Sequence, residues 1–107
     1  MKTLKDVIIK IEDLYEWTDS EEHFEFFEKS FGEEADLETI LKKYKNKGME
    51  AWLLYNAAYY LPNKRYIPEI VGELIKTGNE FYLYQATRYL PKSRRKDLKV
   101  LRKKYNY

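Results

Sequence analysis

The chain has 107 residues, a size that fits one domain with a single hydrophobic core and is too short for a catalytic domain plus a regulatory one. Charged residues make up 36% of the sequence and aromatic residues 17%, including eleven tyrosines, a composition that argues against disorder. No cysteine is present, which excludes disulfides, thiolate metal sites and cysteine nucleophiles. A chain without cysteine suits a reducing compartment, and we expect a cytoplasmic protein.

Charge is unevenly distributed along the chain although the formal net charge is only +2. Residues 12–38 include twelve acidic residues and one lysine, whereas residues 88–104 include nine basic residues and one aspartate. This asymmetry predicts an electrostatic dipole, with an acidic and a basic end.

Residues 3–17 have apolar residues at helical spacing, at Leu4, Val7, Ile8, Ile11, Leu14 and Tyr15. With charges between them, this pattern predicts an amphipathic helix and not a signal peptide. No other stretch approaches the length of a membrane span, so we expect no membrane partner.

The next helix is predicted in "EEHFEFF", where Phe24, Phe27 and Phe31 share a core-facing side. The glutamates of an adjacent side are Glu21, Glu25 and Glu28. These glutamates form either a solvated helix face or a surface for a basic partner. His23 is the only histidine, and without a second one we expect no metal site and no cofactor.

Glycine and proline divide the remaining chain into further helices. Gly32, Gly48 and Gly78 each follow an apolar-periodic run, as glycines in the left-handed conformation do after a helix. Pro62 and Pro91 end two more helices. The candidate N-cap residues are Thr18, Asp19, Ser20, Asp36, Asn79 and Ser93, and Pro68 fits a first helical turn. We expect seven short helices, no strand and an all-α fold.

The short links predict antiparallel neighbours, that is, helical hairpins. We expect one domain over residues 1–107, with N-terminal acidic helices at 3–47 and repeated hairpins at 49–77 and 79–105. The repeat is visible in the sequence, because Tyr60-Leu61-Pro62 recurs as Tyr89-Leu90-Pro91, each after a tyrosine-rich helix.

The two stretches "LLYNAAYYLP…RYIPEIVGELIKTG" and "YLYQATRYLPKSRRKDLKVLRKKY" resemble HEAT-type or similar α-solenoid repeats over residues 49–105. The small residues Ala57, Ala58 and Ala86 lie where such repeats pack their helices closely. The resemblance implies a stack of helical hairpins that serves as a non-catalytic interaction scaffold. A plain bundle of hairpins is the alternative.

Aligning the repeated helices places an aromatic and amide stripe at matching positions. The stripe consists of Trp52, Tyr55, Asn56 and Tyr59 in the first copy and Phe81, Tyr84, Gln85 and Arg88 in the second. Tyrosine and tryptophan supply rigid contact area with a polar group, so the stripe is a candidate partner-binding surface. The alternative is that these rings pack between the repeats.

The C-terminal stretch is strongly basic and offers a second hypothesis. Phosphate contacts are predicted from Arg88, Lys92, Arg94, Arg95 and Lys99, beside tyrosines able to stack on bases. The stretch resembles, in part, the basic aromatic-lined face of HEAT-like DNA glycosylases. The alternative is a polar cap at the end of a solenoid.

No catalytic motif is present, and the three serines lie at or near predicted helix ends. We therefore expect a non-enzymatic protein that binds a folded partner. Its size and acidic half are similar to those of bacterial immunity proteins, which neutralise toxic nucleases, and this resemblance implies a basic toxin as the partner. A nucleic-acid-binding module is the alternative function.

Overall fold

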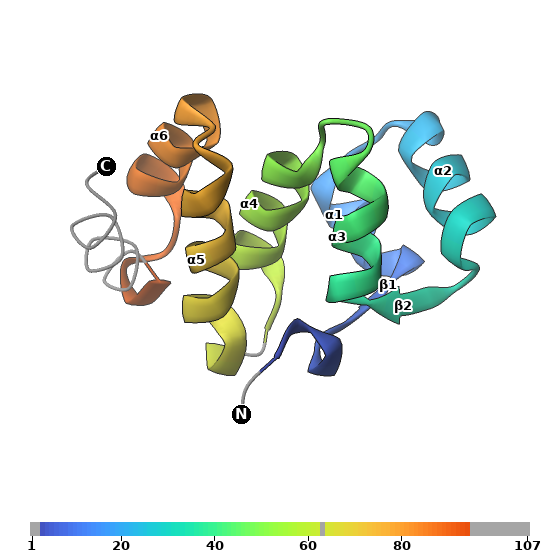
Figure 1. Cartoon of the computed structure of the whole chain (residues 1–107), viewed down its shortest axis with the longest axis horizontal. Helices are drawn as coiled ribbons and strands as arrows, with labels where there is room; N and C mark the ends of the chain where they lie inside the picture. Colours follow the sequence, from blue (N-terminus) through green and yellow to red (C-terminus); the bar gives the residue numbers. More distant parts are fainter. Residues whose placement is uncertain (1–2, 63, 95–107) are drawn as a thin grey trace.

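The computed structural model describes residues 3–62 and 64–94 and is mainly helical, which confirms the predicted fold class (Figure 1). The α-helices are α1 (Leu14–Trp17), α2 (Glu21–Phe31), α3 (Leu37–Lys45), α4 (Glu50–Tyr60), α5 (Ile67–Thr77) and α6 (Glu80–Tyr89). Short 3₁₀ turns cover Leu4–Asp6, Ile11–Asp13 and Lys64–Tyr66. The seventh predicted helix falls mostly on residues outside the described ranges.

Two short strands correct the prediction of a continuous helix over residues 3–17. Strand β1 (Ile8–Lys10) pairs antiparallel with β2 (Glu34–Asp36), and Ile9 lies opposite Ala35. Ile9 is fully buried whereas Ile8 is exposed, which is the two-residue alternation of a strand. The run of β-branched residues favours this extended conformation over a helix.

Several predicted helix boundaries are confirmed by their capping bonds. The Asp36 carboxylate accepts a hydrogen bond from the Thr39 amide at 2.9 Å, and the Asn79 side chain accepts one from the Tyr82 amide at 3.0 Å. Gly78 ends α5 in the left-handed conformation, with φ of 66°. These local signals set the lengths of α3, α5 and α6.

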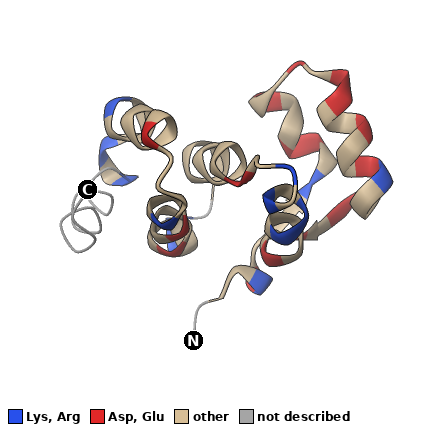
Figure 2. Cartoon of the chain, turned by 45° about the horizontal axis from the view of Figure 1, so that its top comes forward, with Lys and Arg blue, Asp and Glu red and all other residues tan. Residues whose placement is uncertain are grey.

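The helices lie in two rows, and α4 occupies the centre. Figure 2 shows α4 and α6 in one row and α3 and α5 in the other. Helix α4 packs against α1, α3, α5 and α6. Its Leu53, Leu54, Ala57 and Ala58 are buried, as expected for a helix that is apolar on nearly every side. The rows agree with a stack of hairpins, while the HEAT-like arrangement stays a prediction.

The two repeated corners have the same local geometry. Leu61 and Leu90 are buried cap residues with extended backbones, and their amides donate to Ala57 and Ala86 carbonyls at 3.1 and 3.2 Å. The proline that follows each leucine prevents the helix from continuing. The sequence repeat therefore corresponds to a repeated helix end.

Candidate protein-binding surface

One side of the predicted stripe on α4 belongs to the core. The Trp52 ring stacks on His23 of α2 at 4.3 Å between centroids and on Tyr44 of α3 at 6.1 Å. Trp17 of α1 meets it edge-on at 6.1 Å. Because α1, α2 and α3 cover this side of α4, Trp52 is a packing residue rather than an exposed anchor.

Asn56 is also a core residue, contrary to its predicted place in an exposed stripe. Only 7% of its surface is exposed, and its amide donates to the Trp52 carbonyl one turn earlier at 2.8 Å. Its side chain is thus satisfied within α4. The matching Gln85 of α6 is only half-buried, so the two repeated helices differ in what covers them.

The exposed rings gather instead on the C-terminal end of α4 and along α6. We define the aromatic surface as five residues whose exposed fractions are 36% for Tyr59, 38% for Tyr60, 62% for Phe81, 57% for Tyr84 and 54% for Tyr89. Two further exposed apolar or aromatic residues occur in the described part of the chain, Ile8 and Tyr15. The aromatic surface is therefore a concentrated feature of α4 and α6.

Ring contacts connect the two helices beneath the aromatic surface. Tyr55 of α4 lies 5.7 Å from Tyr82 of α6 and 6.1 Å from Tyr59, measured between ring centroids. Tyr82 in turn meets the Phe81 ring edge-on at 4.9 Å. Aromatic pairs at these separations attract one another beyond the effect of burial alone. The half-buried Tyr55 and Tyr82 thus support the exposed rings of Tyr59 and Phe81.

The outward side of α6 extends the aromatic surface with a cation. The Arg88 guanidinium lies 5.9 Å from the centre of the Tyr84 ring, within cation–π range. Helical spacing places Phe81, Tyr84 and Arg88 on the side opposite Leu83 and Ala86, which are buried. Of the predicted partner-binding residues of α6, Phe81, Tyr84 and Arg88 are therefore exposed.

The tyrosine hydroxyls of α4 and α6 are groups that can both donate and accept hydrogen bonds. Burial raises the pKa of Tyr55, with a further contribution from the neighbouring tyrosines Tyr59, Tyr60, Tyr89 and Tyr82. Within residues 3–62 and 64–94 no hydrogen bond engages these hydroxyls. They are available as donors and acceptors toward a partner.

The predicted acidic residues lie at the other end of the molecule. Glu21, Glu25 and Glu28 are exposed on α2, and Figure 2 shows acidic residues concentrated at this end of the chain. No ion pair within the described part of the chain involves these three glutamates. This acidic face presents uncompensated negative charge. The predicted basic end lies mostly outside the described residues.

Arg94, predicted to contact phosphates, has a structural role. Its side chain is buried, and its guanidinium donates to the carbonyls of Ala58 at 2.6 Å, Tyr59 at 3.0 Å and Leu61 at 2.5 Å. These carbonyls belong to the C-terminal end of α4, where a cation is favourable. Among the other predicted phosphate-binding residues Arg88 and Lys92 are exposed, whereas Arg95 and Lys99 lie outside the described residues.

Tyr60 and Tyr82 belong to this region although neither was predicted as a site residue, and Tyr89 was among the tyrosines predicted to stack on bases. The helical spacing of Tyr82 and Tyr89, seven residues apart, places both on one side of α6. That side faces α4, and only the packing of α4 against α6 shows it. The seven-residue spacing of Tyr82 and Tyr89 was therefore visible in the sequence, but the packing of α4 against that side of α6 was not.

His23 lacks the surroundings of a metal ligand. Burial is the main cause that lowers its pKa, and its Nδ1 is buried without a hydrogen-bond partner. In the described ranges no three histidine, aspartate or glutamate side chains gather closely enough to hold a metal ion. Its position against Trp52 is that of a core residue.

Comparisons with protein-family models, with curated proteins and with solved structures find no match to this chain. None of the described helices is long and apolar enough to cross a membrane. Function is therefore inferred from the chemistry of the site itself.

Proposed function

We propose that this protein is a non-catalytic module that binds a folded protein through the aromatic surface. The observation that supports this most strongly is the distribution of exposed rings. Five of the seven exposed large apolar or aromatic residues in the described part of the chain lie on α4 or α6. Such clusters on soluble proteins mark interaction sites.

The chemistry of the aromatic surface suits a protein interface. Tyrosine and arginine are enriched among residues that dominate binding energy, and Tyr84 with Arg88 supplies both in contact. Tyr55 packs against Tyr59 and Tyr82 packs against Phe81, so these two exposed rings lose less side-chain entropy on binding than unsupported rings would. A partner with apolar pockets and hydrogen-bonding groups at their rims would engage rings and hydroxyls together.

The finer proposal is that the partner is a basic toxin or nuclease and that this protein neutralises it, as bacterial immunity proteins do. The supporting feature is the acidic face of α2. Its carboxylates can replace the phosphates that a basic partner binds, and they accelerate association. Reversing Glu21, Glu25 and Glu28 to lysine is expected to slow association by about tenfold or more at low salt. An unchanged association rate would remove the acidic face from the proposal.

Photo-crosslinking tests the main proposal and identifies the partner in the same experiment. Benzoylphenylalanine is placed at Tyr84 in one variant and at Lys42, an exposed residue of α3, in a matched control. We expect Tyr84 to capture one dominant protein in cells of the native organism and Lys42 to capture none of it. Equal capture from both positions, or none from either, would contradict the proposal.

Nucleic-acid binding is the second candidate, supported by Arg88 and Lys92, which are exposed near Tyr89. It is weaker because Arg94 is used within the fold. Affinity for single-stranded DNA or RNA that falls by a decade or more between about 50 and 200 mM salt would support it. Absence of binding to both at low salt would exclude it.

A further inference from the structure

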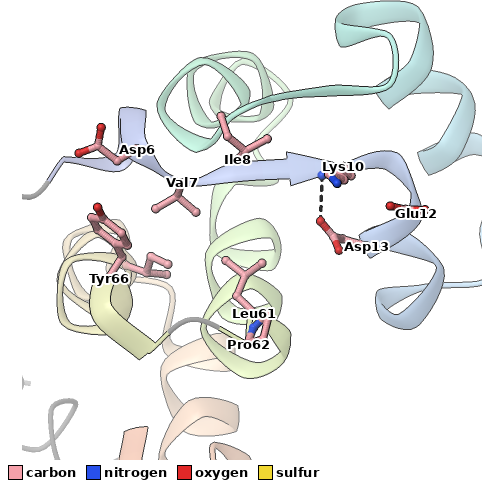
Figure 3. Close-up of a pocket in the computed structure, with 10 residues that line it drawn as sticks. Asp6, Val7, Ile8, Lys10, Glu12, Asp13, Leu61, Pro62 and Tyr66 are labelled. Atoms are coloured by element: carbon pink, nitrogen blue, oxygen red, sulfur yellow. Dashed lines mark hydrogen bonds between the residues drawn. The ribbon is translucent and has the colours of Figure 1, made fainter.

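A cleft of about 310 Å³ lies between β1 and the corner that joins α4 to α5 (Figure 3). Its apolar side is lined by Val7, which directly precedes β1, by Leu61 and Pro62 of the corner, and by Ile70 of α5. The volume is at the lower end of the range of ligand-binding clefts, about 300–1,000 Å³. It shares no lining residue with the aromatic surface, so the inference drawn from it goes beyond the proposed function.

The backbone of β1 offers unpaired hydrogen-bonding groups to this cleft. The Val7 carbonyl accepts from the Leu37 amide at 2.7 Å, and the Ile11 amide donates to the Glu33 carbonyl at 2.8 Å, both on the β2 side. Because backbone groups alternate in direction along a strand, the N–H and C=O of Ile8 point away from β2. Ile8 lines the cleft, and within the described residues its backbone has no other partner.

The rim of the cleft is acidic. Asp6, Glu12 and Asp13 line it together with one cation, Lys10. The Asp13 carboxylate accepts a hydrogen bond from the Lys10 amide at 2.8 Å, which ends the free edge of the strand at that residue (Figure 3). No ion pair among the described residues engages any of the three carboxylates. The rim thus carries net negative charge next to a single available strand position.

We propose that this cleft binds a short extended segment of a partner protein that carries a lysine or arginine beside an apolar residue. The main chain of the segment pairs with the N–H and C=O of Ile8, as in strand addition. Its apolar side chain occupies the cleft between Val7 and Leu61, and its cation meets Asp6 or Glu12.

The negative charge of the rim favours a basic peptide segment over a second copy of this chain or a nucleic acid. Pairing β1 with β1 of a second copy would bring two sets of three carboxylates together, which opposes that arrangement. A nucleic acid would place phosphates against the same carboxylates.

The test uses peptides of defined chemistry and the protein with ¹⁵N-labelled amides. The probe is the acetylated, amidated pentapeptide Val-Lys-Val-Arg-Val, and its control is Val-Glu-Val-Glu-Val. We expect the basic peptide to shift the amide signals of Val7, Ile8 and Leu61 and to bind about tenfold or more tightly than the acidic one. Equal binding of both peptides, shifts confined to other regions, or no shifts at millimolar peptide would overturn the proposal.

Two variants locate the contact. Ile8→Pro removes the amide donor and leaves the β2 side of the strand intact, and Val7 already has an extended backbone that can precede a proline. We expect it to weaken binding of the basic peptide about fivefold or more. Asp6→Asn with Glu12→Gln does not touch the backbone and is expected to reduce the preference for the basic over the acidic peptide. If both folded variants bind like the parent, or if β1 instead mediates a dimer in sedimentation experiments, the proposal is wrong.

Discussion

Arg94 is predicted to contribute strongly to stability because it joins the segment after α6 to the end of α4. Its guanidinium makes three hydrogen bonds of 2.6, 3.0 and 2.5 Å to carbonyls at that end, and 6% of the residue is exposed. Arg94→Met keeps the apolar stem and removes every donor and the charge. Hydrogen bonds to a charged group contribute roughly 1.5–3 kcal/mol each, but water replaces part of this at a helix end. We therefore expect a loss of about 2–3 kcal/mol in the free energy of unfolding.

The assay is urea unfolding followed by far-UV circular dichroism, with the thermal midpoint as a second measure. The expected loss corresponds to a decrease of about 8–15 °C in the midpoint for a chain of this size. Arg94→Lys keeps the charge with poorer geometry and is expected to lie between the parent and Arg94→Met. Lys92→Met is the matched control on the exposed side of the same segment. If Arg94→Met unfolds at the same urea concentration as Lys92→Met, the three hydrogen bonds contribute nothing to stability and the prediction is wrong.

Two further predictions concern the strand and the buried histidine. Ile9→Ala is expected to reduce the free energy of unfolding by about 2–4 kcal/mol, because Ile9 is fully buried. Ile8→Ala is expected to reduce it by about 0.5 kcal/mol or less, because Ile8 is exposed. Equal effects of the two variants in urea unfolding would contradict the strand register. Burial is the main cause that lowers the pKa of His23 from its ordinary 6.5. The charge of Glu22 partly opposes this decrease, and the charge of Lys47 adds to it. The unfolded chain then binds more protons below that pH, so stability falls as the pH decreases from about 7 to 5.5. His23→Phe should reduce this fall in the thermal midpoint, and an unchanged fall would show that other groups cause it.

Much of the helical fold could be predicted because its signals are local. The caps Asp36 and Asn79 and the left-handed Gly78 act on neighbouring residues, and the structure confirms all three. The apolar composition of residues 51–61 is typical of a central helix, and α4 packs against four other helices. These features depend on backbone geometry within one turn, which the residue types determine.

The strands could not be predicted with the same means. Val7, Ile8 and Ile11 fit the spacing of a helix face, whereas Val7 and Ile9 fit the alternation of a strand, and strand preference depends strongly on the partner. That partner, Glu34–Asp36, has no β-branched residue, so only the tertiary pairing reveals it. The helical interpretation was therefore wrong where two periodicities overlapped.

Only part of the candidate site could be predicted from the sequence, because the exposure of each stripe residue depends on which helices pack against α4. Helical spacing placed Trp52 and Tyr59 on one side of α4, but α1, α2 and α3 cover only the Trp52 end. Arg94 has a counterpart in the sequence repeat. It stands four residues after Leu90, as Arg65 stands four residues after Leu61, but Arg65 is exposed and Arg94 is buried, so the spacing marks the repeat and not the role.

The most direct test of the proposed function measures the affinity of the partner captured through Tyr84 for a variant of the aromatic surface. Tyr84→Ala with Tyr89→Ala removes two exposed rings, and Lys42→Ala with Lys76→Ala is the control on α3 and α5. If the aromatic surface is the interface, the tyrosine variant should bind about tenfold or more weakly while retaining its circular dichroism spectrum, and the lysine variant should bind like the parent. Equal dissociation constants for the parent and the folded tyrosine variant would show that the aromatic surface is not the interface.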